Sequence, residues 1–193
     1  MLYVICAPSG AGKTTIIKEI FKLLREPRFS VSATTRSKRN GETDGKDYYF
    51  VTREEFETKI KNNEFIEWEE VHGELYGTLK SEMVKGLEKQ CDVIFDVDVK
   101  GALSIKKLHA DAVTIFINAP KEEIIERLKN RRTESNAQLE KRIERMESEL
   151  KLKDKFDHII DNKSRPGGLQ KAVNEIISII NKTRSVKNTD KEK

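Results

Sequence analysis

The most constraining feature of this chain is a glycine-rich segment near its start, Ala7-Pro8-Ser9-Gly10-Ala11-Gly12-Lys13-Thr14. It follows the apolar run Leu2–Cys6 and precedes a helical pattern over residues 14–24. A strand, a glycine-rich turn, a Lys-Thr pair and a helix together form a phosphate-binding loop. Small residues let successive backbone N–H groups surround phosphate oxygens, and the helix N-terminus adds partial positive charge. The segment therefore predicts an α/β fold that binds phosphate groups.

Within this loop, we expect Lys13 to reach the β and γ phosphates and the Thr14 hydroxyl to hold Mg²⁺. We assign residues 7–15, with Thr15 included, to the nucleotide. The first glycine of the usual pattern is replaced by Ala7, a small residue that resists positive φ. The alternative is an ordinary strand-to-helix turn that carries Gly-Lys-Thr. The flanking strand and helix favour the phosphate-binding loop.

The bulk properties suggest one domain that handles small anionic molecules. A chain of 193 residues can build one sizeable core with small inserted subdomains. Its net charge of +4 is spread along the sequence, which does not indicate nucleic-acid binding. Cys6 and Cys91 lie far apart, so we expect free thiols rather than a disulfide or a metal pair. No apolar run approaches the roughly 20 residues that span a membrane, and no secretory signal is visible. We expect a cytoplasmic protein with no membrane partner.

Alternating strand and helix patterns predict the fold class. Runs dense in Val, Ile and Phe occur at residues 2–7, 92–97, 113–118 and 158–160. Such runs are typical of parallel strands that are buried on both faces. Helical patterns occur at residues 14–24, 79–89, 101–108, 121–130 and 167–181. The alternation predicts an α/β fold with a mainly parallel sheet flanked by helices and ligands at the carboxyl ends of its strands.

Two segments interrupt this alternation. Residues 33–80 predict a small α+β insertion with a strand at 47–51, a helix at 53–61 and a strand at 65–71. Residues 131–150 predict a mostly helical hairpin, which we expect to be part of a lid over 126–150. The core then comprises residues 1–32, 81–125 and 151–182. The polar segment 183–193 is expected to be disordered.

A pair of aspartates follows the apolar strand at 92–97. Asp96 and Asp98 are two residues apart, so their side chains point the same way along a strand. One can bind Mg²⁺, directly or through water, while the other reaches further into the cleft. The alternative is a solvated pair of carboxylates at a strand end.

A basic loop offers donors for a second phosphate. Arg36 and Arg39 are three residues apart and can fork onto one phosphate, and the hydroxyls of Tyr48 and Tyr76 can add donors. Four such donors suit a monophosphate better than a carboxylate. The alternative is a basic surface loop without a ligand.

Glu67 lies in an apolar setting, between Ile66 and Trp68. A buried acid requires a partner, and guanine presents two adjacent donors that one carboxylate can accept. Ser32 and Thr78 offer hydroxyls for the O6 atom of that base. An exposed strand carboxylate explains Glu67 equally well.

The arginines of the predicted hairpin suit a lid. They are Arg131, Arg132, Arg142 and Arg145. Phosphoryl transfer requires positive charge near the transferred group and exclusion of water. The alternative is a charged surface helix whose Glu–Arg pairs lie three and four residues apart.

With these motifs, the sequence resembles the guanylate kinases, which phosphorylate GMP with ATP. The resemblance runs from Leu2 to about Ile180. Besides the phosphate loop, it rests on SVSATTRSKRNGETDGKDYYFV at 30–51, NNEFIEW at 62–68, YG at 76–77, FDVDVKG at 95–101 and RRTE at 131–134. The stretch 30–51 is the most specific of these because it marks the GMP-binding insertion of the family.

The resemblance implies roles for individual residues. It assigns GMP to Ser32, Arg36, Arg39, Tyr48, Glu67, Tyr76, Thr78 and Asp98. It assigns the ATP phosphates and Mg²⁺ to Gly10, Gly12, Lys13 and Thr14, with Asp96 near the metal. It assigns Arg131 and Arg142 to the lid, Arg127 to the ATP side and Asn162 to the adenine. The expected catalytic residues are Lys13, Arg36, Asp96, Arg131 and Arg142.

The sequence departs from the family pattern at three positions, Ala7, Lys100 and Arg132. The expected reaction is in-line transfer of the γ-phosphoryl group of MgATP to GMP, and also to dGMP, by a monomer or homodimer. One alternative is a kinase for another small phosphorylated acceptor, such as a phosphorylated ribose. The other is a non-catalytic guanylate-kinase-like binding module. The retention of Lys13 and Thr14 favours an enzyme over such a module.

Overall fold

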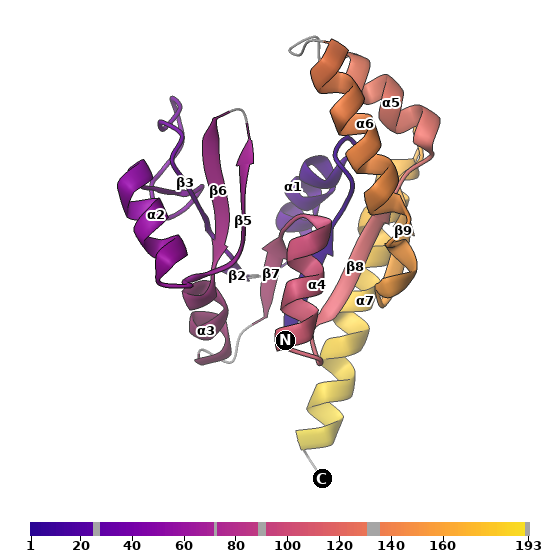
Figure 1. Ribbon diagram of the computed structural model, residues 1–193. Coiled ribbons are helices and arrows are strands. Elements are labelled where there is room, and N and C mark those ends of the chain that lie inside the picture. The colour runs from indigo at the N-terminus through magenta and orange to yellow at the C-terminus, as the bar shows by residue number, and fades with distance from the viewer. Residues whose placement is uncertain (25–27, 72, 89–91, 131–135, 192–193) are drawn as a thin grey trace.

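The computed structural model describes residues 1–24, 28–71, 73–88, 92–130 and 136–191 (Figure 1). In this part of the chain, five parallel strands form the larger sheet. Their order is β2 (Arg28–Phe29), β7 (Val93–Asp96), β1 (Leu2–Cys6), β8 (Val113–Asn118) and β9 (His158–Asp161). The predicted parallel sheet is thereby confirmed. The edge strand β2 was not predicted, because two residues are too few to show a pattern.

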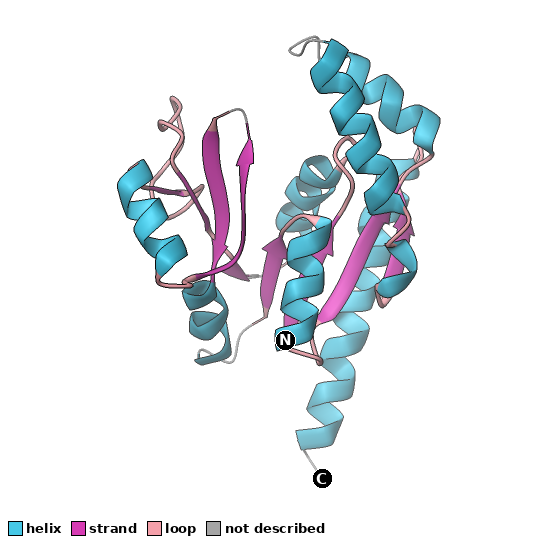
Figure 2. Ribbon diagram, viewed as in Figure 1, coloured by secondary structure: helices cyan, strands magenta, loops and turns pink. Residues whose placement is uncertain are grey.

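Helices cover both faces of this sheet (Figure 2). Tyr3 and Ile5 of β1 pack in a core with α1 (Lys13–Leu23) and α7 (Gly168–Lys191). Val4 and Cys6, which alternate with them, pack in a second core with α4 (Val99–Leu108). Because both faces are buried, apolar residues fill every position of β1. Cys6 is a buried free thiol, and Cys91 lies outside the described residues.

A second sheet forms from the predicted insertion. Its strand order is β4 (Tyr49–Phe50), β3 (Ser32–Thr34), β6 (Glu74–Leu79) and β5 (Phe65–Val71). β6 pairs antiparallel with β3 and β5, and β3 pairs parallel with β4. The helix α2 (Arg53–Lys61) begins at Thr52 with a capping box and packs Phe56 against Phe65 of the sheet. The helix α3 (Lys80–Glu88) leads back to the larger sheet.

Two helices and a short turn lie between β8 and β9. They are α5 (Lys121–Asn130), α6 (Asn136–Leu150) and the 3₁₀ turn η1 (Lys153–Lys155). α5 and α6 lie side by side beyond the carboxyl ends of the parallel strands (Figure 1). Met146 of α6 is fully buried in the core that α1 and α7 share, which anchors this helical pair on the sheet.

The last helix is longer than predicted. α7 ends at Lys191, ten residues beyond the predicted end, so the structure differs from the disorder we expected from residue 183. Asp92 explains part of this difference, because its carboxylate pairs with both Arg184 and the amino group of Met1. The hydroxyl of Tyr3 also donates to the carbonyl of Ile180, at 3.2 Å. Among the described residues, no helix is long and apolar enough to cross a membrane.

Candidate active site

The phosphate-binding loop connects β1 to α1 as predicted. Gly10 and Gly12 adopt positive φ values of 90° and 93°, a backbone conformation that favours glycine. Gly12 is the N-cap of α1 and has no side chain with which to cap the helix. The N–H groups of the first helical turn therefore remain available to phosphate oxygens. Thr14 and Thr15 are exposed in this first turn.

Lys13 is held by the strand next to β1. Its ammonium group forms an ion pair with Asp96 at 2.7 Å and donates to the carbonyl oxygen of Val97. Asp96 lies beside the loop because it pairs in register with Ile5, at the end of β1. Burial opposes the charge on Lys13, but Asp96 outweighs it, and the pKa of Lys13 is raised. Lys13 therefore carries a positive charge at the end of the phosphate-binding loop.

Two side chains that we assigned to ATP, those of Asn162 and Arg127, contact the backbone of the phosphate-binding loop. Asn162 is only 7% exposed and donates from Nδ2 to the carbonyl oxygen of Ala11, at 2.7 Å. A Cβ atom on Gly12 would lie 2.4 Å from the same Nδ2 atom. Arg127 donates to the carbonyl of Gly10 at 3.4 Å and to the hydroxyl of Ser164 at 2.5 Å. Both residues thus support the loop, while their contact with ATP stays a prediction.

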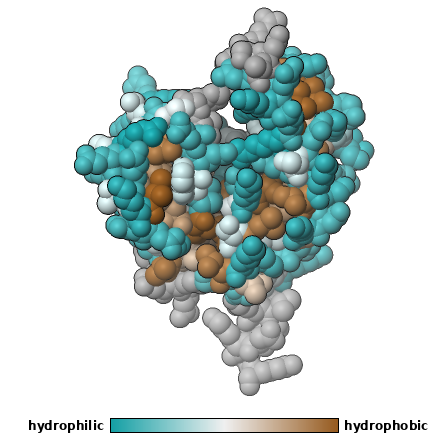
Figure 3. Space-filling model, viewed as in Figure 1, coloured by the Kyte–Doolittle hydropathy of each residue, from teal (hydrophilic) through white to brown (hydrophobic). Residues whose placement is uncertain are grey.

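The helix α6 faces the loop across a cavity of about 480 Å³. Its lining comes from the phosphate loop, β5, the start of α4, and α6. Arg142 of α6 donates to the hydroxyl of Ser9 at 2.9 Å. In Figure 3, mostly hydrophilic residues border the hollow between the second sheet and α6. Arg131 and Arg132, the other predicted lid arginines, lie outside the described residues.

Three of the four predicted monophosphate donors lie close together beside the second sheet. The guanidinium of Arg36 stacks over the ring of Tyr48, 5.5 Å from its centroid, and that ring lies 6.0 Å from the ring of Tyr76. Glu42 accepts two hydrogen bonds from Arg36, at 2.8 and 3.0 Å, and one from the backbone N–H of Arg39. These bonds lower the pKa of Glu42. Glu42, which is not among the predicted site residues, orients the guanidinium of Arg36.

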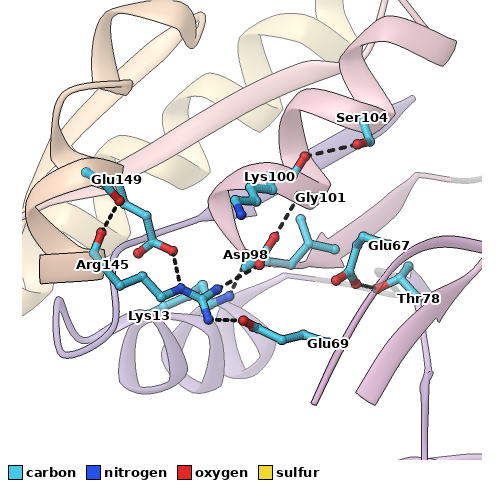
Figure 4. Close-up of polar contacts among 12 residues, drawn as sticks. Lys13, Glu67, Glu69, Thr78, Asp98, Lys100, Gly101, Ser104, Arg145 and Glu149 are labelled. Atoms are coloured by element: carbon cyan, nitrogen blue, oxygen red, sulfur yellow. Dashed lines mark hydrogen bonds and ion pairs between the residues drawn. The ribbon is translucent and has the colours of Figure 1, made fainter. Parts of the chain in front are cut away.

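Three of the residues that are predicted to bind the base lie on adjacent strands, β3, β6 and β5. Ser32 and Glu67 each pair in register with Thr78, on the two sides of β6. Glu67 accepts a hydrogen bond from the Thr78 hydroxyl at 2.5 Å (Figure 4). Burial raises the pKa of Glu67 to about 7, and the charge of Asp98 adds to this effect. Glu67 is thus a largely buried carboxylate whose binding of the base stays a prediction.

Asp98 joins the two halves of the site. It is the N-cap of α4 and accepts from the backbone N–H of Gly101, at 2.7 Å. A Cβ atom on Gly101 would lie 2.4 Å from Cγ of Glu67 and 3.2 Å from Oδ1 of Asp98. Only glycine therefore lets β5 approach α4 this closely. Gly101 belongs to the motif at 95–101, but no role was predicted for it.

Comparisons with known proteins identify the family of this chain. The guanylate kinase family model matches residues 1–183. A guanylate kinase of Thermotoga maritima is 46% identical over 193 residues, with 98% of this chain and 91% of that protein covered. A guanylate kinase of Fusobacterium nucleatum is 43% identical over 183 residues, with 93% and 95% covered. The crystal structure of guanylate kinase from Anaplasma phagocytophilum superposes with a TM-score of 0.70 at 28% identity, covering 95% of this chain and 85% of that one. The chain belongs to the guanylate kinase family.

Proposed function

We propose that this chain is an ATP:GMP phosphotransferase that transfers the γ-phosphoryl group of ATP to the phosphate of GMP, giving ADP and GDP. The observation that carries the proposal is the arrangement around Asp98. This residue lies between the cavity at the phosphate loop and the carboxylate of Glu67 on the second sheet. A donor site at the phosphate loop and an acceptor site at Glu67 would then meet at Asp98. Because no residue is assigned to the ribose 2′-hydroxyl, we include dGMP as an acceptor.

The donor side would bind the triphosphate of ATP. The backbone N–H groups of Gly10 and Gly12 and those at the N-terminus of α1 would contact the phosphates, and Lys13 would supply a charge. Thr14 and Asp96 are the residues that would hold Mg²⁺. One hydroxyl and one carboxylate fit this ion, which usually keeps several waters and binds few protein ligands beside the phosphates. When bound, Mg²⁺ would neutralise part of the charge on the phosphates.

The acceptor side would bind GMP at both ends. Arg36, Arg39, Tyr48 and Tyr76 would hold its phosphate through charge-assisted hydrogen bonds. Glu67, in its ionised form, would accept from N1–H and from the exocyclic amine of guanine. Ser32 and Thr78 would hydrogen-bond to the base beside it, and Asp98 would face the base from α4. Adenine lacks this pair of donors, so the site would select guanine.

Catalysis would come from position and charge rather than from acid–base chemistry. The phosphate of GMP is already an anion, so the attacking oxygen requires no base. Lys13 and Arg142 would stabilise the charge on the transferred group, and the resemblance adds Arg131 to this set. Closure of α6 and the second sheet over the nucleotides would exclude water from the reaction.

An ADP-release assay with MgATP tests this function. The acceptors are GMP, dGMP, AMP, CMP, UMP and ribose bisphosphate. We expect ADP release with the guanine nucleotides alone. Release with a different acceptor would retain the kinase and contradict the guanine site. Folded protein that binds GMP but releases no ADP would instead be a non-catalytic binding module.

A further inference from the structure

Arg145 of α6 contacts three carboxylates from three different parts of the fold, and beyond its place in the predicted lid it has no role in the function proposed above (Figure 4). Its Nε atom donates to Glu149 of α6 at 2.8 Å, and its Nη2 atom donates to Asp98 at 2.9 Å. Its Nη1 atom donates to Glu69 of β5. Each nitrogen of the guanidinium therefore has a different partner.

Glu149 fixes the direction of this side chain. It lies one helical turn after Arg145 and is only 4% exposed. Burial raises the pKa of Glu149, and the adjacent charge of Arg145 opposes that rise. Because Nε is bound to a buried carboxylate on its own helix, the two Nη atoms point away from α6. They reach the N-terminus of α4 and the strand β5.

The two Nη contacts of Arg145 connect α6 to the residues that are predicted to bind guanine. Glu67 and Glu69 are two residues apart on β5 in a regular part of its register, so their side chains lie on the same face. Glu69 also pairs in register with Tyr76, a predicted phosphate donor. Asp98 is contacted directly, and its other carboxylate oxygen binds Gly101, against which Glu67 packs. Arg145 therefore joins α6 to both walls that enclose Glu67.

We propose that Arg145 is a positioning residue for the acceptor site. Its bond to Asp98 fixes the orientation of that carboxylate, and its ion pair with Glu69 holds β5 against α4. Together these contacts maintain the spacing that a guanine base requires between Glu67 and Asp98. The inference rests on the proposed function and deepens it, because it assigns part of the affinity for GMP to a residue that does not itself bind GMP.

The structure separates this role from that of Arg142, one helical turn earlier. Arg142 contacts Ser9 of the phosphate loop, on the donor side. Arg145 lines the same cavity as Arg142, but it contacts Glu69 and Asp98, on the side of that cavity nearer the second sheet. Loss of Arg145 should therefore affect the acceptor and leave the donor nearly unchanged. A direct role at the transferred phosphoryl group would have the opposite signature.

Steady-state kinetics of three variants test the proposal. Glu69→Gln removes the ion pair to β5 at a partly exposed position where folding is not at risk. Arg145→Ala removes all three contacts, and Arg145→Lys retains the charge without the planar fork. The control is Glu147→Gln, elsewhere on α6, which breaks an exposed ion pair with Lys121 of α5. GMP is varied at saturating MgATP, and MgATP is then varied at saturating GMP.

We expect Glu69→Gln to raise KM for GMP about threefold and Arg145→Ala to raise it about tenfold, since partly exposed ion pairs contribute modestly. Arg145→Lys should lie between wild type and Arg145→Ala. The value of kcat and KM for ATP should change by less than about twofold, and the control should match wild type. In the double variant, Glu69→Gln should add little to Arg145→Ala, because both changes remove the same pair.

The proposal is overturned if KM for GMP is unchanged in both Glu69→Gln and Arg145→Ala. It is also overturned if kcat falls while KM for GMP stays constant. If the wild-type protein shows no kinase activity, the proposed function fails, and calorimetry with GMP alone then decides the inference. Weaker GMP binding by Glu69→Gln than by Glu147→Gln would support it, and equal binding would refute it.

Discussion

The side-chain amide of Asn162 donates to the carbonyl oxygen of Ala11 at 2.7 Å, and these two residues are 151 positions apart in the chain. The contact joins the segment after β9 to the centre of the phosphate-binding loop. The backbone N–H of Asn162 is itself bound to the carbonyl of Asn118, also at 2.7 Å. The loop conformation is therefore supported by the neighbouring ends of β8 and β9, in addition to the freedom of its glycines.

Replacement of Asn162 should impair the donor side. Asn162→Ala leaves the buried carbonyl of Ala11 without its amide donor, and the loop can then relax. We expect KM for ATP to rise about tenfold, with KM for GMP changed by less than about twofold. Asn174→Ala, at an exposed position of α7, is the matched control. An equal rise in both KM values would show that Asn162 supports the whole fold rather than the loop.

Lys13→Ala should abolish turnover without unfolding the protein. Lys13 is charged and lies at the bend of the loop, where its charge would stabilise the transferred phosphoryl group. We expect kcat to fall at least about a thousandfold, while circular dichroism and GMP binding remain those of wild type. Lys22→Ala, an exposed change on the same helix, should retain full activity. If Lys13→Ala retained near wild-type activity, the phosphate-loop assignment would be incorrect.

Gly101→Ala should weaken GMP binding although alanine favours a helix. The added methyl group would lie 2.4 Å from Cγ of Glu67, so the carboxylate must move away from Asp98. We expect KM for GMP to rise about tenfold or more, while helix propensity offsets part of any loss of stability. Ser104→Ala, one helical turn further along α4, is the control. An unchanged KM for GMP would mean that the base does not bind between Glu67 and Asp98.

Local patterns predicted the parallel sheet because its central strands β1, β7 and β8 are buried along nearly their whole length and are therefore dense in apolar residues. They missed β2, which has two residues, and placed a five-residue strand where β4 has two. The local patterns also predicted that α7 ends at 181, because they contain no signal for the pairing of Arg184 with Asp92, 92 positions away. Short edge strands and helix ends depend on such long-range contacts, which have no periodic signal.

The same contrast between local patterns and long-range contacts applies to the candidate site. Residues such as Lys13 and Arg36 occur in motifs whose spacing carries the chemistry; Lys13 lines the cavity at the phosphate loop, and Arg36 lies beside Tyr48 at the second sheet. Arg145 was read only as one of several lid arginines, because nothing in its local sequence indicates Asp98 or Glu69 as partners. The positions of Gly101 and Asn162 likewise became informative only when the fold showed what lies against them.

GMP binding should strengthen as the pH rises through 7. Burial raises the pKa of Glu67 from an ordinary value of 4.5 to about 7, with the Thr78 hydroxyl opposing the shift and Asp98 adding to it. Lys13 of α1 favours the ionised form, and Glu69 of β5 disfavours it. The guanine base requires the ionised carboxylate, of which about one tenth is present at pH 6 and about nine tenths at pH 8. The Kd for GMP, measured by calorimetry, should therefore fall about ninefold between these pH values.

The stability of the ligand-free protein should respond to pH in the opposite direction. The folded state holds the Glu67 proton more tightly than the unfolded state, so this group makes folding less favourable as the pH rises from about 4.5 to about 7. Glu67→Gln keeps the shape of the side chain without titrating. It should flatten this part of the pH dependence of the melting temperature, weaken GMP binding at pH 8, and reduce the preference for GMP over AMP. A Kd for GMP that is the same at pH 6 and pH 8 in the wild-type protein would show that Glu67 does not bind the base as a titrating carboxylate.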